Sequence, residues 1–183
     1  MRPPIVDFLM VILWFNQVAY AQADFGSGEM LSGTEVTWAT EVQARDPVPL
    51  SDGSAASYGT PLYFWMRIEG NEKALRELEQ RGMLPIRHRW VRYGGLGSSV
   101  ELDAAPTDEI VLGVGKEALL PRLRLELESR RHFDWRIWSM KRNLRSGHWA
   151  VDVVYSDAAR SPVQCRKQEG QGLRPCHFEV DVR

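Results

Sequence analysis

Two clusters of basic and aromatic side chains are the residues of this chain best suited to binding chemistry. The first is the triplet His88, Arg89 and Trp90, and the second comprises Arg136, Trp138, Lys141 and Arg142. Guanidinium groups bind carboxylates and phosphates through two parallel hydrogen bonds, and indole faces stack on sugar rings or cations. If the two segments are neighbouring strands, they form one cationic and aromatic surface. The alternative is a solvated sheet face on which arginine stems cover tryptophan and pair with glutamate.

A metal or acid–base site is a second candidate, because the chain holds residue types that such sites use: His88, His132, Asp134 and His148. His132 and Asp134 are two residues apart, so they share one face if the backbone is extended. Zinc catalysis needs three ligands and an open position, and no HExxH or comparable spacing is present. A hydrogen-bonded structural role for His88 therefore competes with a ligand role.

Other reaction classes have weaker support. Ser139 could act as a nucleophile with a histidine base, but no GxSxG or SxxK context surrounds it. The glycines of residues 94–97 follow a predicted strand, yet they open no helix and lack the lysine of a phosphate loop. The basic stretch Arg122–Arg145 is interleaved with acids, and the net charge is -1, which both argue against nucleic-acid binding. We predict no cofactor, no metal and no nucleic-acid partner.

The N-terminus resembles a secretory signal peptide of residues 1–21. Arg2 supplies the positive charge, Phe8–Phe15 is an unbroken apolar run, and Ala19-Tyr20-Ala21 is a small-x-small cleavage site. The apolar run is far shorter than the roughly 20 residues that span a bilayer. We therefore expect cleavage after Ala21 and a periplasmic or secreted protein that is not transmembrane after cleavage. The alternative is an uncleaved anchor.

The two cysteines, Cys165 and Cys176, lie near the C-terminus. In an exported chain this spacing predicts one disulfide, worth roughly 3 kcal/mol in the chain-entropy model. Two free thiols would require the cytosol. A zinc site is disfavoured, because a cysteine pair with His177 beside it lacks a fourth ligand and the usual tight spacing.

Alternation of apolar and polar residues predicts most of the domain as short strands. They are expected at 36–42, 62–69, 85–93, 98–102, 109–114, 163–166 and 176–182, together with a central antiparallel hairpin at Phe133–Tyr155. A helix is expected at Glu72–Arg81, capped by Asn71 and Gly82. Lys116–Arg131 fits a helix or a strand, and its composition favours a helix. The segment Arg45–Pro61 is rich in Pro, Ser, Gly and Asp and predicts a loop.

Composition and strand count together predict the fold class. A content of 44% hydrophobic and 26% charged residues is that of a globular protein, and seven tryptophans are typical of sandwich cores. We predict a mainly β, immunoglobulin-like antiparallel β-sandwich with one or two short helical insertions. The expected organisation is a signal peptide at 1–21, a flexible lead at 22–34 and a single domain at 35–183.

Three stretches in order resemble a bacterial family known as domain of unknown function 2914. They are Leu62–Gly70, His88-Arg89-Trp90, and Trp135–Val154. The family pattern is an aromatic strand, an HRW triplet, then a WR-x-W/Y-S-x-K block followed by G-x-W-x-V. The helical insertions and the cysteine pair depart from that pattern. The resemblance covers roughly residues 38–182 and implies an exported, envelope-associated β-sandwich without an established reaction.

These observations favour a non-enzymatic binding module of the bacterial cell envelope. Its partner would be an envelope polysaccharide or a protein, met by the Trp/Arg surface. The rival hypothesis is an envelope hydrolase or metal-dependent enzyme that uses His88, His132 and His148. A third possibility is a structural subunit that docks through its sheet edges.

Overall fold

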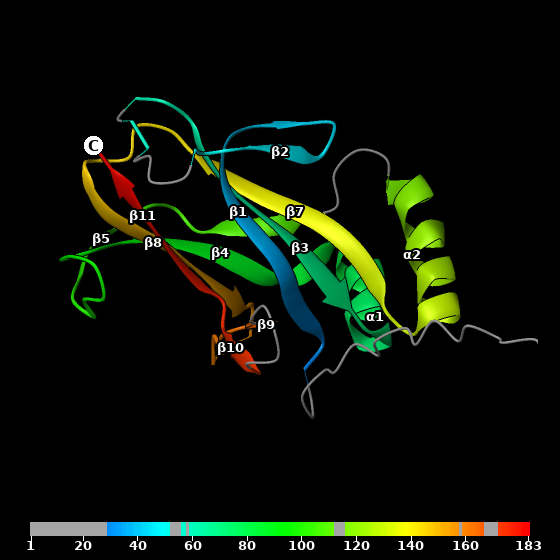
Figure 1. Cartoon of the computed structure of the whole chain (residues 1–183). Helices are drawn as coiled ribbons and strands as arrows, with labels where there is room; N and C mark the ends of the chain where they lie inside the picture. Colours follow the sequence, from blue (N-terminus) through cyan, green and yellow to red (C-terminus); the bar gives the residue numbers. More distant parts are fainter. Residues whose placement is uncertain (1–28, 52–55, 58, 112–115, 158, 167–171) are drawn as a thin grey trace, which may run out of the picture.

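Eleven strands and two helices make up the part of the chain that this computed structural model describes, which is residues 29–51, 56–57, 59–111, 116–157, 159–166 and 172–183 (Figure 1). The elements are β1 (Leu31–Gln43), β2 (Asp46–Pro49), β3 (Leu62–Gly70), α1 (Glu72–Arg81), β4 (Met83–Tyr93), β5 (Glu101–Ala104), β6 (Asp108–Val111), α2 (Lys116–Arg130), β7 (Phe133–Lys141), β8 (Gly147–Tyr155), β9 (Gln164–Arg166), β10 (Leu173–Pro175) and β11 (His177–Val182). The predicted signal peptide and its cleavage site lie outside the described residues.

Two sheets pack face to face. The first sheet has the order β10-β9-β1-β3-β7, with β2 paired to β1, and the second has the order β11-β8-β4-β5, with β6 paired to β4. All pairings are antiparallel except that of β1 with β9. This is the immunoglobulin-like β-sandwich with helical insertions that the sequence predicts.

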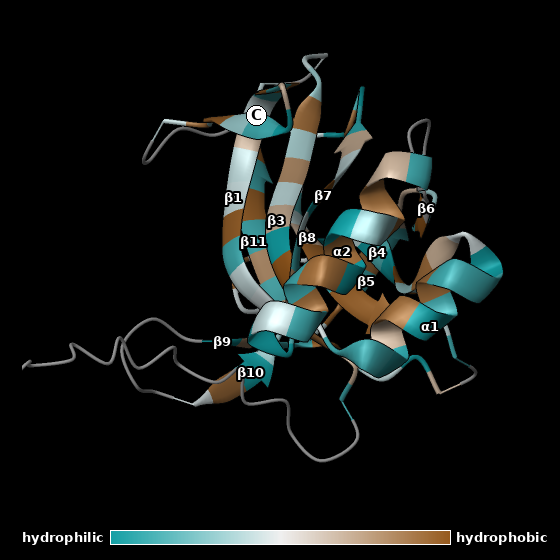
Figure 2. Ribbon diagram, turned by 90° about the vertical axis from the view of Figure 1, so that its right-hand side faces the viewer, coloured by the Kyte–Doolittle hydropathy of each residue, from teal (hydrophilic) through white to brown (hydrophobic). Residues whose placement is uncertain are grey.

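The core lies between the sheets and is built from alternate residues of each strand. In β3, Leu62, Phe64, Met66 and Ile68 are buried on the inner face, as the alternation predicts. Figure 2 shows the corresponding apolar and polar bands along this strand. Because the inner residues of both sheets meet in one layer, the side chains of the outer faces are the ones available for contacts with other molecules.

The predicted central hairpin is wrong. Its two strands are present, but β7 pairs with β3 in the first sheet and β8 pairs with β4 and β11 in the second. The connection therefore crosses from one sheet to the other. Trp135 and Trp149 both point into the core, from opposite sides. Asn143 and Gly147 have positive φ angles, as expected for a reversal, but alternation cannot say whether two successive strands pair or face each other.

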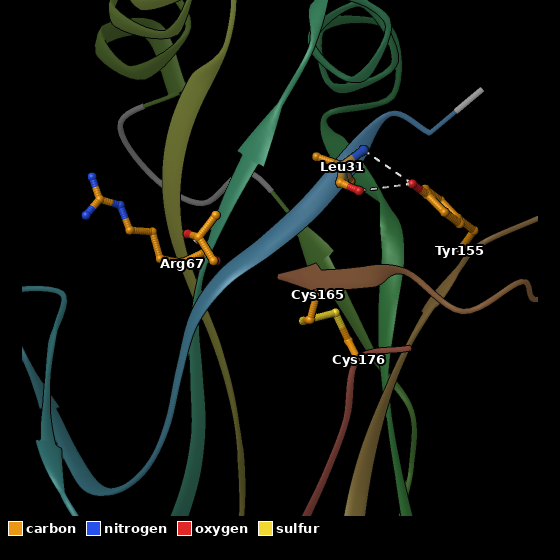
Figure 3. Close-up of a disulfide and its surroundings, with 6 residues drawn as sticks. Leu31, Arg67, Tyr155, Cys165 and Cys176 are labelled. Atoms are coloured by element: carbon orange, nitrogen blue, oxygen red, sulfur yellow. Dashed lines mark hydrogen bonds between the residues drawn. A yellow bond between two sulfur atoms is a disulfide. The ribbon is translucent and has the colours of Figure 1, made fainter. Parts of the chain in front are cut away.

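The first strand begins earlier than predicted and continues into a hairpin. β1 starts at Leu31, so Leu31–Thr34 of the expected flexible lead are strand, and Leu31 is fully buried. Its backbone N–H donates to the hydroxyl of Tyr155 at 3.2 Å, as Figure 3 shows. The predicted loop 45–61 contains β2, whose register pairs Gln43 with Asp46. The two prolines of β2 favour a loop in the sequence, but prolines are tolerated in an edge strand.

Both helices are confirmed and lie at one end of the sandwich (Figure 1). The Asn71 side chain accepts hydrogen bonds from the N–H groups of Lys73 and Ala74, and Gly82 ends α1 with a φ of 68°. In α2, Leu123 is fully buried, while Arg122, Glu126 and Arg130 recur every four residues along one side of the helix. α2 thereby brings a charged stripe next to β7.

The predicted disulfide between Cys165 and Cys176 is present and buried (Figure 3). It joins β9 to the residue that precedes β11. Gly33 of β1 passes so close that an added Cβ would collide with the Cys165 sulfur. The bond thus packs against β1 as well as closing the C-terminal loop. None of the helices in the described residues is long and apolar enough to cross a membrane.

Candidate functional site

The residues predicted to form one cationic and aromatic surface are divided between the two sheets. The triplet 88–90 lies in β4 of the second sheet, whereas Arg136 and Trp138 lie in β7 of the first. The condition for a single surface, that the two segments are neighbouring strands, is not met, because they face each other across the core. Arg89 and Arg136 consequently lie on opposite outer faces of the molecule.

His88 and Trp90 are fully buried and join the two sheets through a polar contact in the core. The indole Nε1–H of Trp90 donates to Ser139 Oγ at 3.0 Å, and His88 Nδ1 lies 2.9 Å from the same oxygen. Burial, with a smaller contribution from the Lys141 charge, lowers the pKa of His88 to about 3, so the imidazole is neutral. Ser139 and a histidine do meet, but neither is accessible to a substrate, and their contact is structural.

The other predicted members have separate environments. Lys141 is nearly buried and forms an ion pair with Asp108 at 2.7 Å. Arg142 is exposed just after β7. Arg89 pairs with Glu101 and with Asp152 on the outer face of the second sheet. Of the predicted set, only Arg136 and Trp138 therefore share an accessible surface, the outer face of the first sheet.

The three histidines of the metal hypothesis do not converge. His88 is in the core and His148 pairs with Asp181 at 2.9 Å on the outer face of the second sheet. His132 does approach Asp134, as their spacing predicts, and Glu69 completes a group whose ligand atoms lie within 4.8 Å of one another. His132 Nδ1 lies 3.0 Å from the carbonyl oxygen of Arg130, to which its N–H donates, leaving Nε2 as an acceptor.

Arginines already occupy both carboxylates of that group. Asp134 pairs with Arg67 at 3.2 Å and with Arg130 at 3.1 Å, and Glu69 pairs with Arg166 at 2.8 Å. A divalent cation would have to bind against three guanidinium charges. The local charge balance therefore disfavours a cation and favours an anion.

An arginine-lined cavity of about 280 Å³ opens on the outer face of the first sheet, between β3, β7, α2 and the β1–β2 turn. We call it the arginine pocket. Its lining comprises five arginines and two acids: Arg45, Arg67, Arg122, Arg130, Arg136, Glu126 and Asp134. Figure 3 shows the Arg67 side chain pointing away from the disulfide and the core, on this outer face. Alternation in β3 and β7 and the four-residue period in α2 direct these side chains to one place.

The register of β3 and β7 places like residues opposite each other on this face. Glu69 lies opposite Asp134, Arg67 opposite Arg136, and Trp65 opposite Trp138. Like charges in directly opposed positions destabilise a sheet. The acids of the first row offset the arginines of the second, and the third row sets an indole pair beside them. Trp138 is 38% exposed, whereas Trp65 is covered.

Ion pairs hold most of the pocket arginines in place. Glu126 pairs with Arg122 at 3.2 Å and with Arg130 at 3.1 Å, and its second role is to accept the backbone N–H of Asp134 at 3.0 Å. Arg136 pairs with Asp46 at 2.7 Å, but Asp46 is largely exposed. Counting the lining residues and their ion-pair partners in the described part of the chain, five guanidinium groups thus face three carboxylates, which leaves an excess of two positive charges.

Arg45 is the pocket arginine without a carboxylate partner in the described part of the chain. It occupies the second position of a two-residue turn in which both central residues have positive φ, 48° for Ala44 and 75° for Arg45. This is the type I′ geometry, which strongly prefers Asn and Gly. The Trp65 indole donates to the Arg45 carbonyl at 2.9 Å and anchors the turn over the sheet. Burial, and then the charges of Arg122 and Arg136, lower the pKa of Arg45.

Most of this pocket was missed at the sequence level. The sequence singles out Arg136, but Arg45 falls in a predicted loop, and Arg122 and Arg130 fall in a basic stretch that is interleaved with acids. The Arg-Glu-Arg repeat at every fourth position of a helix was a usable signal. The proximity of Arg45 and Arg67 could not be predicted from the sequence, because it depends on the β1–β2 turn and on which strand pairs with β7.

The outer face of the second sheet carries a different cluster, which we call the acid–histidine network. His177 lies between Asp152 at 2.6 Å and Glu179 at 3.3 Å, and His148 lies between Glu179 at 3.5 Å and Asp181 at 2.9 Å. Arg89 and Tyr93 also contact Asp152. Burial by itself lowers the pKa of His177, but its hydrogen bonds to Asp152 and Glu179 outweigh burial, and the pKa is raised.

Comparisons with known proteins give little beyond this geometry. No family model matches the chain, and no curated protein matches it. One similar solved structure is the CARDB domain of the PF1109 protein from Pyrococcus furiosus, crystallised in complex with di-metal ions. The TM-score is 0.32 at 7% identity, over 83% of this chain and 91% of that chain. This similarity is too distant to carry a conclusion about function.

Proposed function

We propose that this protein is an exported, non-enzymatic binding module of the bacterial cell envelope that recognises an acidic polysaccharide through the outer face of its first sheet. The observation behind the proposal is the arginine pocket, whose excess positive charge lies beside the exposed indole of Trp138. Guanidinium groups bind the anionic substituents of a sugar, and an indole stacks on the ring.

Export is part of the proposal and rests on three observations. Residues 1–21 have the pattern of a signal peptide, and the resemblance to the domain of unknown function 2914 family also implies an envelope location. The disulfide between Cys165 and Cys176 is the expected state of two cysteines in an oxidising compartment. Detection of the protein in a periplasmic or secreted fraction with its first residue at Gln22 tests both export and cleavage.

The binding proposal is tested by a double variant, Arg136→Ala with Trp138→Ala, in a pull-down on immobilised acidic and neutral polysaccharides. Both side chains lie on the outer face, so the variant is expected to keep the fold and to lose binding to acidic polysaccharide. Arg89→Ala is the matched control, because it removes a guanidinium from the opposite outer face and leaves the pocket intact. Equal binding by wild-type and double-variant protein contradicts the proposal.

A protein partner is the other outcome of the same experiment. If neither polysaccharide is retained but an envelope protein is captured by the wild type and not by the double variant, the surface is correct and the partner class is wrong. If the Arg89→Ala control loses binding instead, the active face is that of the second sheet.

The rival function, a metal-dependent hydrolase, retains one specific observation, the group formed by Glu69, His132 and Asp134. His88 and His148 lie elsewhere in the structure and cannot be ligands of this metal site. Metal analysis of the purified protein decides between the two functions. A stoichiometric transition metal that is lost in a His132→Ala variant would favour the hydrolase, whereas we expect no such metal, because Arg67, Arg130 and Arg166 already pair with the carboxylates.

A further inference from the structure

The charge of the arginine pocket narrows the class of anion that it fits. We propose that the pocket binds a phosphate monoester dianion carried by a sugar, in preference to the monoanionic carboxylate of an acidic sugar. The inference rests on the proposed function and deepens it, because it concerns the same face and names the substituent that the pocket recognises.

Charge balance is the first argument. Among the described residues, the five guanidinium groups of the lining form ion pairs with only three carboxylates, Asp46, Glu126 and Asp134, so two of the five positive charges have no paired carboxylate. A phosphate monoester carries about -1.5 to -2 charges near neutral pH and offers three acceptor oxygens. A carboxylate carries one negative charge and two oxygens, and would leave one guanidinium without a counter-charge. Uncompensated like charges at close range are destabilising in a partly enclosed cavity.

The second argument is which arginines are available to bind. Arg130 is held by both acids of the lining, and Arg67 and Arg122 each have one of these carboxylates as partner. Within the residues that the structure describes, Arg45 has only the carbonyl oxygen of Arg136 as an acceptor, at 3.4 Å. Arg136 pairs with Asp46, whose side chain is 66% exposed, and such exposed pairs are worth at most about 1 kcal/mol. Arg45 and Arg136 are therefore the two guanidinium groups free to turn to a ligand.

The third argument is the backbone of the turn that presents Arg45. Two successive non-glycine residues in the left-handed region cost of order 1 kcal/mol each, and such conformations cluster at functional sites. The Trp65 hydrogen bond to the Arg45 carbonyl fixes this conformation. The arrangement keeps a partly buried guanidinium close to Arg122 and Arg136, so that burial first, and then the charges of these two arginines, lower the Arg45 pKa.

Size and position are consistent with a charged group rather than with a whole sugar. Sites for drug-sized ligands are roughly 300–1,000 Å³, and this cavity is about 280 Å³. The phosphate would enter the cavity, and the sugar ring would remain outside. Trp138 lies two residues from Arg136 on the same face of β7, where its indole can cover that ring.

The test is calorimetric titration of the purified protein with glucose 6-phosphate and with glucuronate, at about pH 8, where the phosphate is a dianion, and at low, fixed ionic strength. The two probes have similar rings and differ in the charge of the substituent. We expect glucose 6-phosphate to bind at least about tenfold more tightly, as one additional charge-assisted hydrogen-bond pair allows. In Arg45→Gln the preference should fall to near unity, while Arg142→Gln, an exposed arginine outside the pocket, should retain it.

Competition with inorganic phosphate separates recognition of the phosphate group from recognition of the sugar ring. Competition by inorganic phosphate as strong as that by glucose 6-phosphate assigns recognition to the phosphate group alone. A weaker effect of inorganic phosphate, with Trp138→Ala weakening only the sugar phosphate, assigns a contribution to the ring. Both results support a phosphate site.

Two results overturn the inference. One is equal affinity for glucose 6-phosphate and glucuronate in the wild type, and the other is a preference for the phosphate that survives in Arg45→Gln. Neither affects the proposed function, provided that the Arg136→Ala, Trp138→Ala variant still loses acidic polysaccharide. Retention of polysaccharide by that variant would end the proposed function and this inference together.

Discussion

The two outer faces of the sandwich use charged residues in opposite ways. In the arginine pocket, five guanidinium groups share three carboxylates, and one of them, Arg45, has no acidic partner among the described residues. In the acid–histidine network, both nitrogens of His148 and of His177 face carboxylates. The arginine pocket has positive charge that no paired carboxylate among the described residues neutralises, whereas the charged groups of the acid–histidine network lie beside opposite charges.

This difference suggests which face binds. A network whose charged groups already lie beside opposite charges gains little from a ligand, because a ligand must displace existing contacts of similar strength. A pocket with excess charge gains from neutralisation as well as from new hydrogen bonds. The number of charged residues is therefore a poor guide, and the balance between them is the informative quantity.

The largest effect that we predict is a pH dependence of the free energy of unfolding, caused by His88 in the core. It must be separated from any pH dependence caused by residues of the two outer faces. His88 has a folded pKa of about 3 against an unfolded value near 6.5. Its contribution to stability is therefore fully present above pH 6.5 and is lost as the pH falls toward 3. The slope approaches 1.4 kcal/mol per pH unit within this window. Urea unfolding at several pH values should show this slope in the wild type.

His88→Gln is the matched variant, because glutamine can still hydrogen-bond to Ser139 but does not titrate. The slope between about pH 6.5 and 4.5 should largely disappear, whatever the change in absolute stability. His132→Gln, a partly exposed histidine, should leave the slope in place. An unchanged slope in His88→Gln would mean that the core histidine is not the origin.

The next effect compares one carboxylate from each face. Asp134→Asn removes an acid shared by two pocket arginines, and Asp152→Asn removes one that contacts His177, Arg89 and Tyr93. Each substitution is expected to cost about 2 kcal/mol, since hydrogen bonds to a charged group are lost. Sulfate should restore more stability to Asp134→Asn than to Asp152→Asn, because only the pocket binds the added anion.

The measurement is thermal unfolding in sulfate and in chloride at matched ionic strength, with the wild type as reference for the general stabilisation by sulfate. If sulfate restores the thermal stability of both variants equally, the two faces do not differ in anion binding.

A smaller effect comes from the β1–β2 turn. Arg45→Gly and Ala44→Gly both relieve a positive φ, and each should stabilise the protein by up to about 1 kcal/mol. Arg45→Gly should also lose anion binding, whereas Ala44→Gly should keep it. Chemical unfolding and the titration described above measure the two properties. Loss of binding in Ala44→Gly would assign the effect to the turn rather than to the guanidinium.

The sequence predicted the inward and outward faces of individual strands well, and their partners poorly. Alternation correctly predicts that Leu62, Phe64, Met66 and Ile68 share the inner face of β3, because it depends only on the backbone geometry of a single strand. The pairing of β7 with β3, and its position across the core from β8, depends on contacts between segments far apart in the chain. Because β4 and β7 lie in different sheets, the residues predicted to form one surface are divided. His88 and Trp90 contact Ser139 in the core, and the remaining residues lie on two separate outer faces.

The arginine pocket escaped prediction for the same reason. Arg45, Arg67, Arg122 and Arg136 come from four different elements, and no local spacing relates them. The prolines of β2 also hid the hairpin that presents Arg45. By contrast, the cap residues of α1 and the Cys165–Cys176 disulfide follow from local or compositional rules and were predicted correctly.

The smallest effect that we predict is on the second face and has the opposite pH sense to that of the core. A neutral imidazole has only one N–H, so His177 can donate to both Asp152 and Glu179 only when protonated, and its pKa is raised. Its contribution to stability is therefore present below the unfolded pKa, near 6.5, and is lost as the pH rises through the higher folded value. Because the side chain is 39% exposed, solvent screening reduces the effect to a few tenths of a kcal/mol.

His177→Gln should accordingly lower stability slightly at about pH 5.5 and have less effect at about pH 8.5. The cleanest background is the His88→Gln variant, in which the larger and opposite slope of the core has been removed. Stability measured across this range by urea unfolding should then fall slightly with rising pH in His88→Gln, and should lose that fall when His177→Gln is added. If adding His177→Gln leaves the curve unchanged, the network does not respond to pH, and the second face differs from the first only in being neutralised by its own residues.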